Sequence, residues 1–188
     1  GLGHQKPWGL VSATAIAKPS KETMTHAPAL MPDEDVRGYW GRVLRLNAVP
    51  TDQCAEEQFR AQVRYQHGLQ DPGRNNIAEA ICAIANVDLV TLLREHSLVP
   101  LHGAVAGSVV AADWRDMGAR RWELQQLTMN QQRLSVCRCL GCAQEDLRFW
   151  GFTYWRRAHL IPGVLWCAKH NLPLFRVARL PTWQLMPH

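Results

Sequence analysis

Two pairs of metal-ligand residues constrain the fold of this chain more than any other feature of its sequence. Cys139 and Cys142 form a Cys-x-x-Cys pair, and Cys167 and His170 form a Cys-x-x-His pair after 24 intervening residues. Each pair can hold one ion from a single turn of chain, and together the four residues complete a tetrahedral Cys3His shell. The spacing fits a zinc ribbon or a treble-clef-like finger better than a compact Cys-Cys-His-His finger, whose inner spacer is about 12 residues. We therefore predict one structural Zn²⁺ ion; the alternative is a set of unconnected buried thiols and an imidazole.

The other three cysteines are not expected to bind the ion. Cys137 lies too close to Cys139 for the usual pair spacing, and we interpret it as a packed thiol or a weak alternative ligand. Cys54 and Cys82 lie on apolar helix faces, where a free cysteine behaves as a small hydrophobic residue, so both are predicted in the core.

Catalytic motifs are missing from the sequence. It contains no His-x-Glu paired with Pro-Cys-x-x-Cys, no His-Glu-x-x-His, no Gly-x-Ser-x-Gly and no glycine-rich phosphate loop. Glu145 and Asp146 are adjacent and would diverge on a helix, so we interpret them as residues of a helix N-terminus. A closed Cys3His shell also leaves no position for a substrate water. We predict a protein without catalytic residues.

Hydrophobic periodicity predicts helices in the first half of the chain. One apolar stripe recurs at helical spacing and consists of Val36, Tyr39, Trp40, Val43 and Leu44. Residues 32–35, Pro-Asp-Glu-Asp, are types that a helix N-terminus favours. A second helix is predicted within residues 52–66, followed by a turn at residues 70–76.

Residues 76–96 have the pattern of two short helices joined by a tight turn. Asn76 can cap the first helix, Asn86 can end it in the left-handed conformation, and Asp88 can cap the second. This pattern is typical of a helix-turn-helix, in which Thr91 and Arg94 would face a DNA groove. The alternative is an ordinary pair of packed helices.

Positive charge is concentrated in the second half of the chain. Residues 1–114 carry 10 Lys/Arg and 12 Asp/Glu, whereas residues 115–188 carry 11 Lys/Arg and 4 Asp/Glu. Arginine forks suit phosphate, and arginine beside aromatic rings can also stack on bases. We therefore predict DNA contacts by Arg138, Arg156 and Arg157, with the alternative that Arg157 or His159 packs against neighbouring elements. The aromatic residues predicted to pack around the metal are Trp150, Tyr154, Trp155 and Trp166.

The predicted fold is mainly α-helical with a small zinc-ribbon-like β element. We expect a flexible extension at residues 1–30, a helical helix-turn-helix-like region at 31–114 and a basic zinc-finger region at 115–188. Within the last region, residues 118–126 are compatible with a short helix and residues 133–139 alternate like a strand. No stretch approaches about 18 consecutive apolar residues, and the first 20 residues lack the h-region of a signal peptide. We expect a cytoplasmic protein with no membrane partner.

The zinc segment resembles that of the TniQ/TnsD transposition proteins. The residues that carry the likeness are "RCLGCAQED", "YWRRAHLIPGV" and "CAKHNLPLF"; "MPDEDVRGYWGRVLRLNAV" and "LLREHSLVPLH" are similar to earlier blocks of the family. The resemblance spans about residues 31–174. Three positions depart from the family pattern: Leu140 replaces a proline, Asn171 a glycine, and Gly38 a serine. None of the three is a predicted ligand.

The resemblance implies an accessory role in DNA transposition. Such proteins help to choose the insertion site and recruit an AAA+ ATPase, which engages the transposase. Some relatives bind target DNA, and others bridge to an RNA-guided CRISPR effector. The expected partners are therefore DNA, the ATPase, the transposase or such an effector, and a second copy of the chain. Two alternatives stay open: a sequence-specific transcription regulator that uses residues 76–96, and a protein-interaction adaptor without DNA contact.

Overall fold

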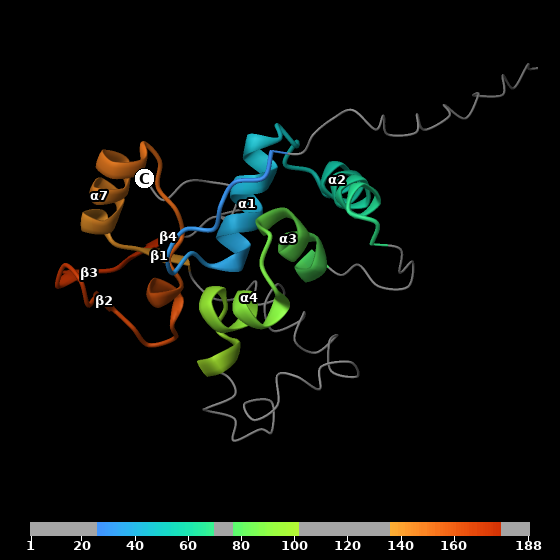
Figure 1. Cartoon of the computed structure of the whole chain (residues 1–188). Helices are drawn as coiled ribbons and strands as arrows, with labels where there is room; N and C mark the ends of the chain where they lie inside the picture. The colour runs from blue at the N-terminus through green and yellow to red at the C-terminus, as the bar shows by residue number, and fades with distance from the viewer. Residues whose placement is uncertain (1–25, 70–76, 102–135, 178–188) are drawn as a thin grey trace, which may run out of the picture.

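Helices dominate the computed structural model, which describes residues 26–69, 77–101 and 136–177. In the first half, α1 spans Val36–Leu46, α2 Gln53–Gln66, α3 Ile77–Ala85 and α4 Leu89–His96 (Figure 1). The helices predicted from periodicity are confirmed. The predicted turn at 70–76, the cap at Asn76, the helix at 118–126 and most of the extension at 1–30 lie outside the described residues.

The apolar stripe of α1 forms the centre of the main core. Asp35 caps this helix by accepting a hydrogen bond from the Arg37 backbone N–H, which lies 3.0 Å from its Oδ1 atom. The stripe packs against apolar residues of α2, α3 and α4, and the Trp40 and Phe59 rings lie 5.8 Å apart between their centroids. The buried members of this cluster are Val36, Tyr39, Trp40, Val43, Leu44, Phe59, Val63, Ile77, Ala78, Ala80, Ile81, Ile84 and Leu92.

The turn between α3 and α4 has the predicted chemistry. Asn86 adopts a positive φ of 55°, a conformation that asparagine tolerates better than most residues. Asp88 then caps α4, with its Oδ1 atom 2.9 Å from the Thr91 backbone nitrogen. The two short helices are confirmed, whereas their use as a DNA-reading helix-turn-helix stays a prediction.

The second half combines short strands with one longer helix. Strand β1 spans Val136–Arg138, helix α7 Leu140–Trp150 and the 3₁₀ helix η2 Arg157–Leu160; β2 spans Trp166–Cys167, β3 Leu172–Pro173 and β4 Phe175–Val177. β1 pairs with β4 and β2 with β3, both antiparallel. The predicted fold class is therefore confirmed, with two-stranded sheets beside the Cys3His residues.

Backbone hydrogen bonds join the segment before α1 to the segment before η2. Glu34 and Arg156 form an isolated antiparallel bridge, the Asp35 N–H donates to the Trp155 carbonyl at 2.8 Å, and the Arg157 N–H donates to the Asp33 carbonyl at 2.8 Å. The two predicted regions on either side of residue 114 are thus in direct contact, and the boundary between them stays a prediction.

Three side-chain predictions were wrong. Cys54 is exposed rather than buried in the core, because it lies off the face of α2 that buries Phe59 and Val63. Trp150 and Trp166 are 55% and 57% exposed and so do not enclose the metal site, although Tyr154 and Trp155 are buried. Glu145 and Asp146 lie in the middle of α7 and not in its first turn, because the helix begins at Leu140.

Candidate metal centre

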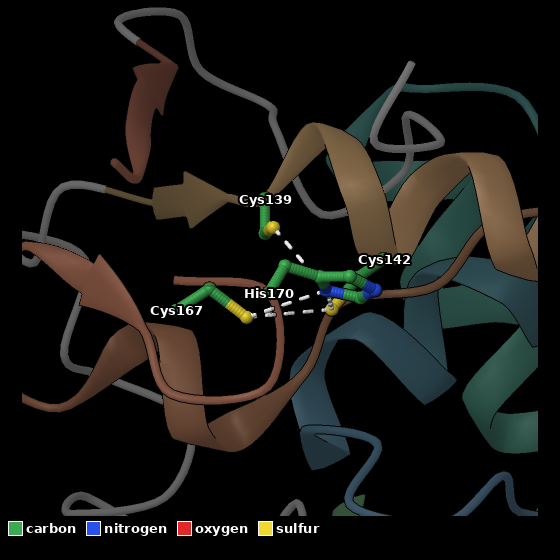
Figure 2. A group of neighbouring side chains, drawn as sticks. All are labelled: Cys139, Cys142, Cys167 and His170. Atoms are coloured by element: carbon green, nitrogen blue, oxygen red, sulfur yellow. Dashed lines mark hydrogen bonds between the residues drawn. The ribbon is translucent and has the colours of Figure 1, made fainter. Parts of the chain in front are cut away.

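The four predicted ligands converge on one point between α7 and the β2–β3 turn (Figure 2). Their ligand atoms all lie within 4.8 Å of one another. His170 Nδ1 is 3.7 Å from the sulfur of Cys139, 3.3 Å from that of Cys142 and 3.7 Å from that of Cys167. The sulfurs of Cys142 and Cys167 are 3.7 Å apart. In the part of the chain that the structure describes, this is the one such group of three or more candidate ligands.

These distances match the edges of a zinc tetrahedron. Zn–S bonds of about 2.3 Å and Zn–N bonds of about 2.0–2.1 Å place two sulfurs about 3.8 Å apart and a sulfur and a nitrogen about 3.6 Å apart. The four separations of 3.3–3.7 Å agree with these values, and the remaining two, from the Cys139 sulfur to those of Cys142 and Cys167, are within 4.8 Å. All three cysteines of the group are buried, so the cluster can hold one ion away from solvent. With four protein ligands, such a site is closed and structural.

Local structure explains how each pair presents its ligands. Cys139 occupies the N-cap position of α7 and Cys142 lies in the first turn of that helix. Leu140, which replaces the proline of the family pattern, is the first helical residue, a position that proline favours but does not require. In the β2–β3 turn, the Asn171 N–H donates to the Cys167 carbonyl, and Asn171 has a φ of 49°. Asparagine can adopt this left-handed conformation, so it replaces the family's glycine without loss of the turn.

The pKa values of the clustered side chains are shifted in different directions. Burial and the neighbouring Cys167 sulfur raise the pKa of Cys142. Burial also acts to raise the pKa of Cys167, but hydrogen bonds from the backbone N–H and ring of His170 and from the ring of His159 outweigh it and lower that pKa. The Cys167 sulfur and then Glu145 raise the pKa of His170. Metal binding needs deprotonated thiols and a neutral imidazole, so an incoming cation would release the protons that these groups still carry.

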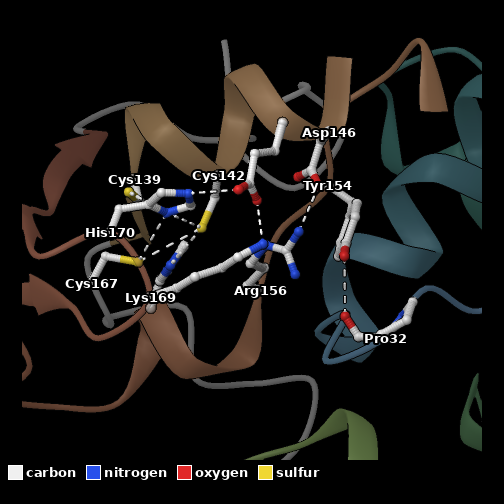
Figure 3. Close-up of polar contacts among 11 residues, drawn as sticks. Pro32, Cys139, Cys142, Asp146, Tyr154, Arg156, Cys167, Lys169 and His170 are labelled. Atoms are coloured by element: carbon white, nitrogen blue, oxygen red, sulfur yellow. Dashed lines mark hydrogen bonds and ion pairs between the residues drawn. The ribbon is translucent and has the colours of Figure 1, made fainter. Parts of the chain in front are cut away.

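A second set of residues surrounds the ligands (Figure 3). His170 Nε2 lies 3.0 Å from Glu145 Oε1, and Lys169 Nζ donates to the other oxygen of the same carboxylate. These contacts hold the pKa of Glu145 below its usual value, Lys169 having the larger effect. The buried His159 ring approaches from η2, with its Nε2 atom 3.7 Å from the Cys142 sulfur. Cys137 is half-buried and lies outside the ligand group.

Two of the predicted DNA-contact residues pair with carboxylates of the chain itself. Arg156 Nη2 donates to Asp146 Oδ1 at 2.5 Å, and its guanidinium lies 4.4 Å from the Tyr154 ring centroid. Arg157 Nε donates to Asp33 Oδ1 at 3.1 Å. Arg157 thus contacts the segment before α1, in agreement with the alternative interpretation that it packs against neighbouring elements. Whether either residue meets DNA stays a prediction.

The other predicted contacts lie on β1 and α4. Arg138 lies half-buried on β1, opposite Phe175 of β4. Arg94 is 63% exposed on α4 and pairs with Glu95, and the Thr91 hydroxyl donates to Asp88 Oδ2. The structure thus brings the four candidate metal ligands together. The five predicted DNA contacts lie on α4, on β1 and at the start of η2, and Arg157 Nη1 donates a hydrogen bond to the Arg94 carbonyl oxygen.

The sequence pattern predicted other roles for two residues around the cluster, a helix N-terminus for Glu145 and packing for His159. The position of Glu145 beside the ligands could have been predicted from the sequence. Residues three apart on a helix share a face, and Glu145 follows Cys142 by three residues. His159 has no such signal, since its approach to Cys142 depends on how η2 packs against α7.

The fold and the cluster define a class: mainly helical proteins with a finger-like Cys3His group that can hold one metal ion. A family model narrows this class, because the TniQ model matches residues 26–174, most of the chain. The protein belongs to the TniQ family and is associated with transposition. Searches of the curated proteins and of the solved structures each found no match. Among the described residues, no helix combines the length and apolar character needed to cross a membrane.

Proposed function

We propose that this protein is a non-catalytic adaptor of DNA transposition that helps to select the insertion site and recruits the AAA+ ATPase of the transposon. The observation that carries the proposal is the TniQ match over residues 26–174, which includes both the helical core and the Cys3His cluster. The ATPase in turn engages the transposase, and an RNA-guided effector or a second copy of the chain is a further candidate partner. The cytoplasm is the expected location.

The cluster serves this function as a scaffold. Three sulfurs and one imidazole form a donor set that suits Zn²⁺, and the separations between the donor atoms support a tetrahedral ion. The described part of the second half contains two carboxylates, Glu145 and Asp146, and both are engaged in ion pairs. Neither is free to act as a general base, which supports a role without catalysis.

Direct DNA contact would fall to arginines that are not held by a carboxylate in the described part of the chain. Arg148 on α7 and Arg176 on β4 are exposed, and no ion-pair partner for either exists within the described ranges. Arg156 and Arg157 are held by Asp146 and Asp33, and releasing them would leave those carboxylates unpaired. We infer that Arg148 and Arg176 are the first residues that a phosphate backbone would meet.

A second candidate function is a protein-interaction adaptor without DNA contact. Large apolar side chains on the second half support it: Phe149 is 75%, Leu165 68%, Trp166 57% and Trp150 55% exposed. Aromatic residues of this kind are enriched among the residues that dominate protein–protein binding.

A salt series on the zinc-loaded chain distinguishes the two candidates. Binding to random duplex DNA should weaken as salt rises, and each phosphate contact removed should reduce the log–log slope by about 1. The double variant Arg148→Ala/Arg176→Ala tests the exposed arginines. Arg60→Ala on α2, which is none of the predicted contacts and pairs with Glu56, is the matched control. No DNA binding even at low salt would leave the interaction adaptor as the function.

The transposition role itself needs a cellular assay. We expect that omitting the protein from an assay containing the ATPase, the transposase and a marked transposon abolishes insertion or scatters the insertion sites. Unchanged frequency and unchanged site distribution would refute the proposed function, whatever the outcome of the DNA-binding series.

A further inference from the structure

The His170 ring is held from both sides. Its Nδ1 atom faces the sulfurs of Cys139, Cys142 and Cys167 at 3.3–3.7 Å, while its Nε2 atom lies 3.0 Å from Glu145 Oε1. An ionised carboxylate has no hydrogen to donate, so the hydrogen of this contact belongs to Nε2. In the neutral imidazole, the lone pair is then on Nδ1 and points at the cluster.

Glu145 is itself fixed by both halves of the site. It lies on α7 three residues after Cys142, so the two side chains share one face of the helix. Its second oxygen accepts a hydrogen bond from Lys169, the residue before His170. The carboxylate therefore joins the helix that carries one ligand pair to the turn that carries the other.

The contact to His170 differs from an ordinary surface ion pair. Lys169 is 61% exposed, and a salt bridge of that kind contributes little to stability. His170 is only 18% exposed, and its other face is closed by α7, where a Cβ added at Gly141 would lie 2.7 Å from the ring. A ring confined in this way has one orientation in which both nitrogens have partners.

We propose that Glu145 is a positioning residue of the metal centre: it orients the His170 ring and fixes its tautomer so that Nδ1 binds the ion. This inference rests on the Cys3His site of the proposed function. Carboxylates that accept a hydrogen bond from a metal-binding histidine strengthen it as a ligand, and their removal costs about 10–100-fold in metal affinity.

The test measures the Zn²⁺ affinity of the full-length protein by competition with a chromophoric chelator. Glu145→Ala should weaken binding about 10–100-fold, whereas Glu145→Gln should retain most of the affinity, because its amide oxygen can still accept the Nε2 hydrogen. Lys169→Ala is the matched control, since it removes the exposed ion pair but keeps the contact to His170, and its affinity should change less than about threefold.

Two further measurements separate positioning from general stability. Urea unfolding of the metal-free variants should give equal free energies, and the Co²⁺-loaded Glu145→Ala variant should show an altered d–d absorption spectrum because the imidazole ligand moves. Equal Zn²⁺ affinity in Glu145→Ala and the wild type, or equal losses in Glu145→Ala and Lys169→Ala, would overturn the positioning role alone. A wild-type chain that binds no Zn²⁺ would overturn the metal site as well.

Discussion

Gly141 offers a sensitive probe of the candidate metal centre because it lies against the ring of His170, one of the four candidate ligands. A methyl group at this position would lie 2.7 Å from His170 Cγ, 2.8 Å from Cδ2 and 3.2 Å from Cβ. Non-bonded carbon atoms pack at about 3.5–4.0 Å, so in Gly141→Ala the ring would have to move by about 1 Å.

The two physical effects of Gly141→Ala have opposite signs. Alanine is favoured over glycine in a helix by about 1 kcal/mol, which favours α7 wherever that helix is formed. A displacement of about 1 Å, however, far exceeds the tolerance of about 0.2 Å in metal–ligand distances. Loss of a well-placed nitrogen ligand should lower Zn²⁺ affinity at least about 100-fold, or about 2.8 kcal/mol. The metal-loaded protein should therefore be less stable than the wild type although its apo form is not.

Chelator competition and thermal unfolding with and without Zn²⁺ measure both effects. Gln144→Ala, on the exposed face of the same helix, is the control and should bind Zn²⁺ as the wild type does. If Gly141→Ala kept wild-type affinity, the close packing of His170 on α7 would be refuted as a determinant of the site.

Three further predictions concern the metal and the buried charges. Cys142→Ser or removal of the metal should unfold residues 139–174 but leave α1–α4 folded, because structural zinc contributes about 10–16 kcal/mol of apparent binding free energy in finger peptides. Amide NMR spectra would show which residues unfold, and a fully folded metal-free chain would contradict the prediction. Arg42→Met should lower the free energy of urea unfolding by about 3–5 kcal/mol, because it leaves the fully buried Glu34 without its ion-pair partner. Arg60→Ala should cost under about 1 kcal/mol, because the side chains of the Arg60–Glu56 pair are 22% and 23% exposed and Glu56 keeps the hydrogen bond from Trp40 Nε1. Burial raises the pKa of Glu34 above 4.5, so between pH 4.5 and the folded pKa the folded state binds more protons than the unfolded state. The stability of the wild type relative to Glu34→Gln should therefore fall as pH rises through this range, and a pH-independent difference would contradict the prediction.

The sequence predicted those features that depend on local spacing. The α1 stripe follows from a 3.6-residue period, and the ligand quartet follows from two short pairs whose geometry one turn of chain sets. Cys54 could have been assigned correctly by the same logic. It precedes Phe59 by five residues, which on a helix places it far from the face that Phe59 and Val63 bury.

Features that depend on tertiary partners could not be predicted in this way. The charges of Arg156 and Arg157 are evident in the sequence, but their carboxylate partners lie 10 and 124 residues away. Likewise, the role of Glu145 depends on the β2–β3 turn meeting α7. The local sequence pattern predicts the charge of these residues and the helix they lie on, but it does not predict which residue each one pairs with.

Asp146 of α7 limits how far Arg156 is available to a polyanion. Cys142, Glu145 and Asp146 are three and four residues apart, so a ligand, the carboxylate on His170 and the carboxylate on Arg156 share the inner face of one helix. Asp146 is 3% exposed, so a phosphate that captured Arg156 would leave a buried carboxylate without its partner. Breaking a buried pair in this way typically costs about 3–5 kcal/mol, more than one phosphate contact returns in physiological salt. Arg148 lies on the outer face of the same helix and carries no such penalty, which makes it the more informative residue to replace first.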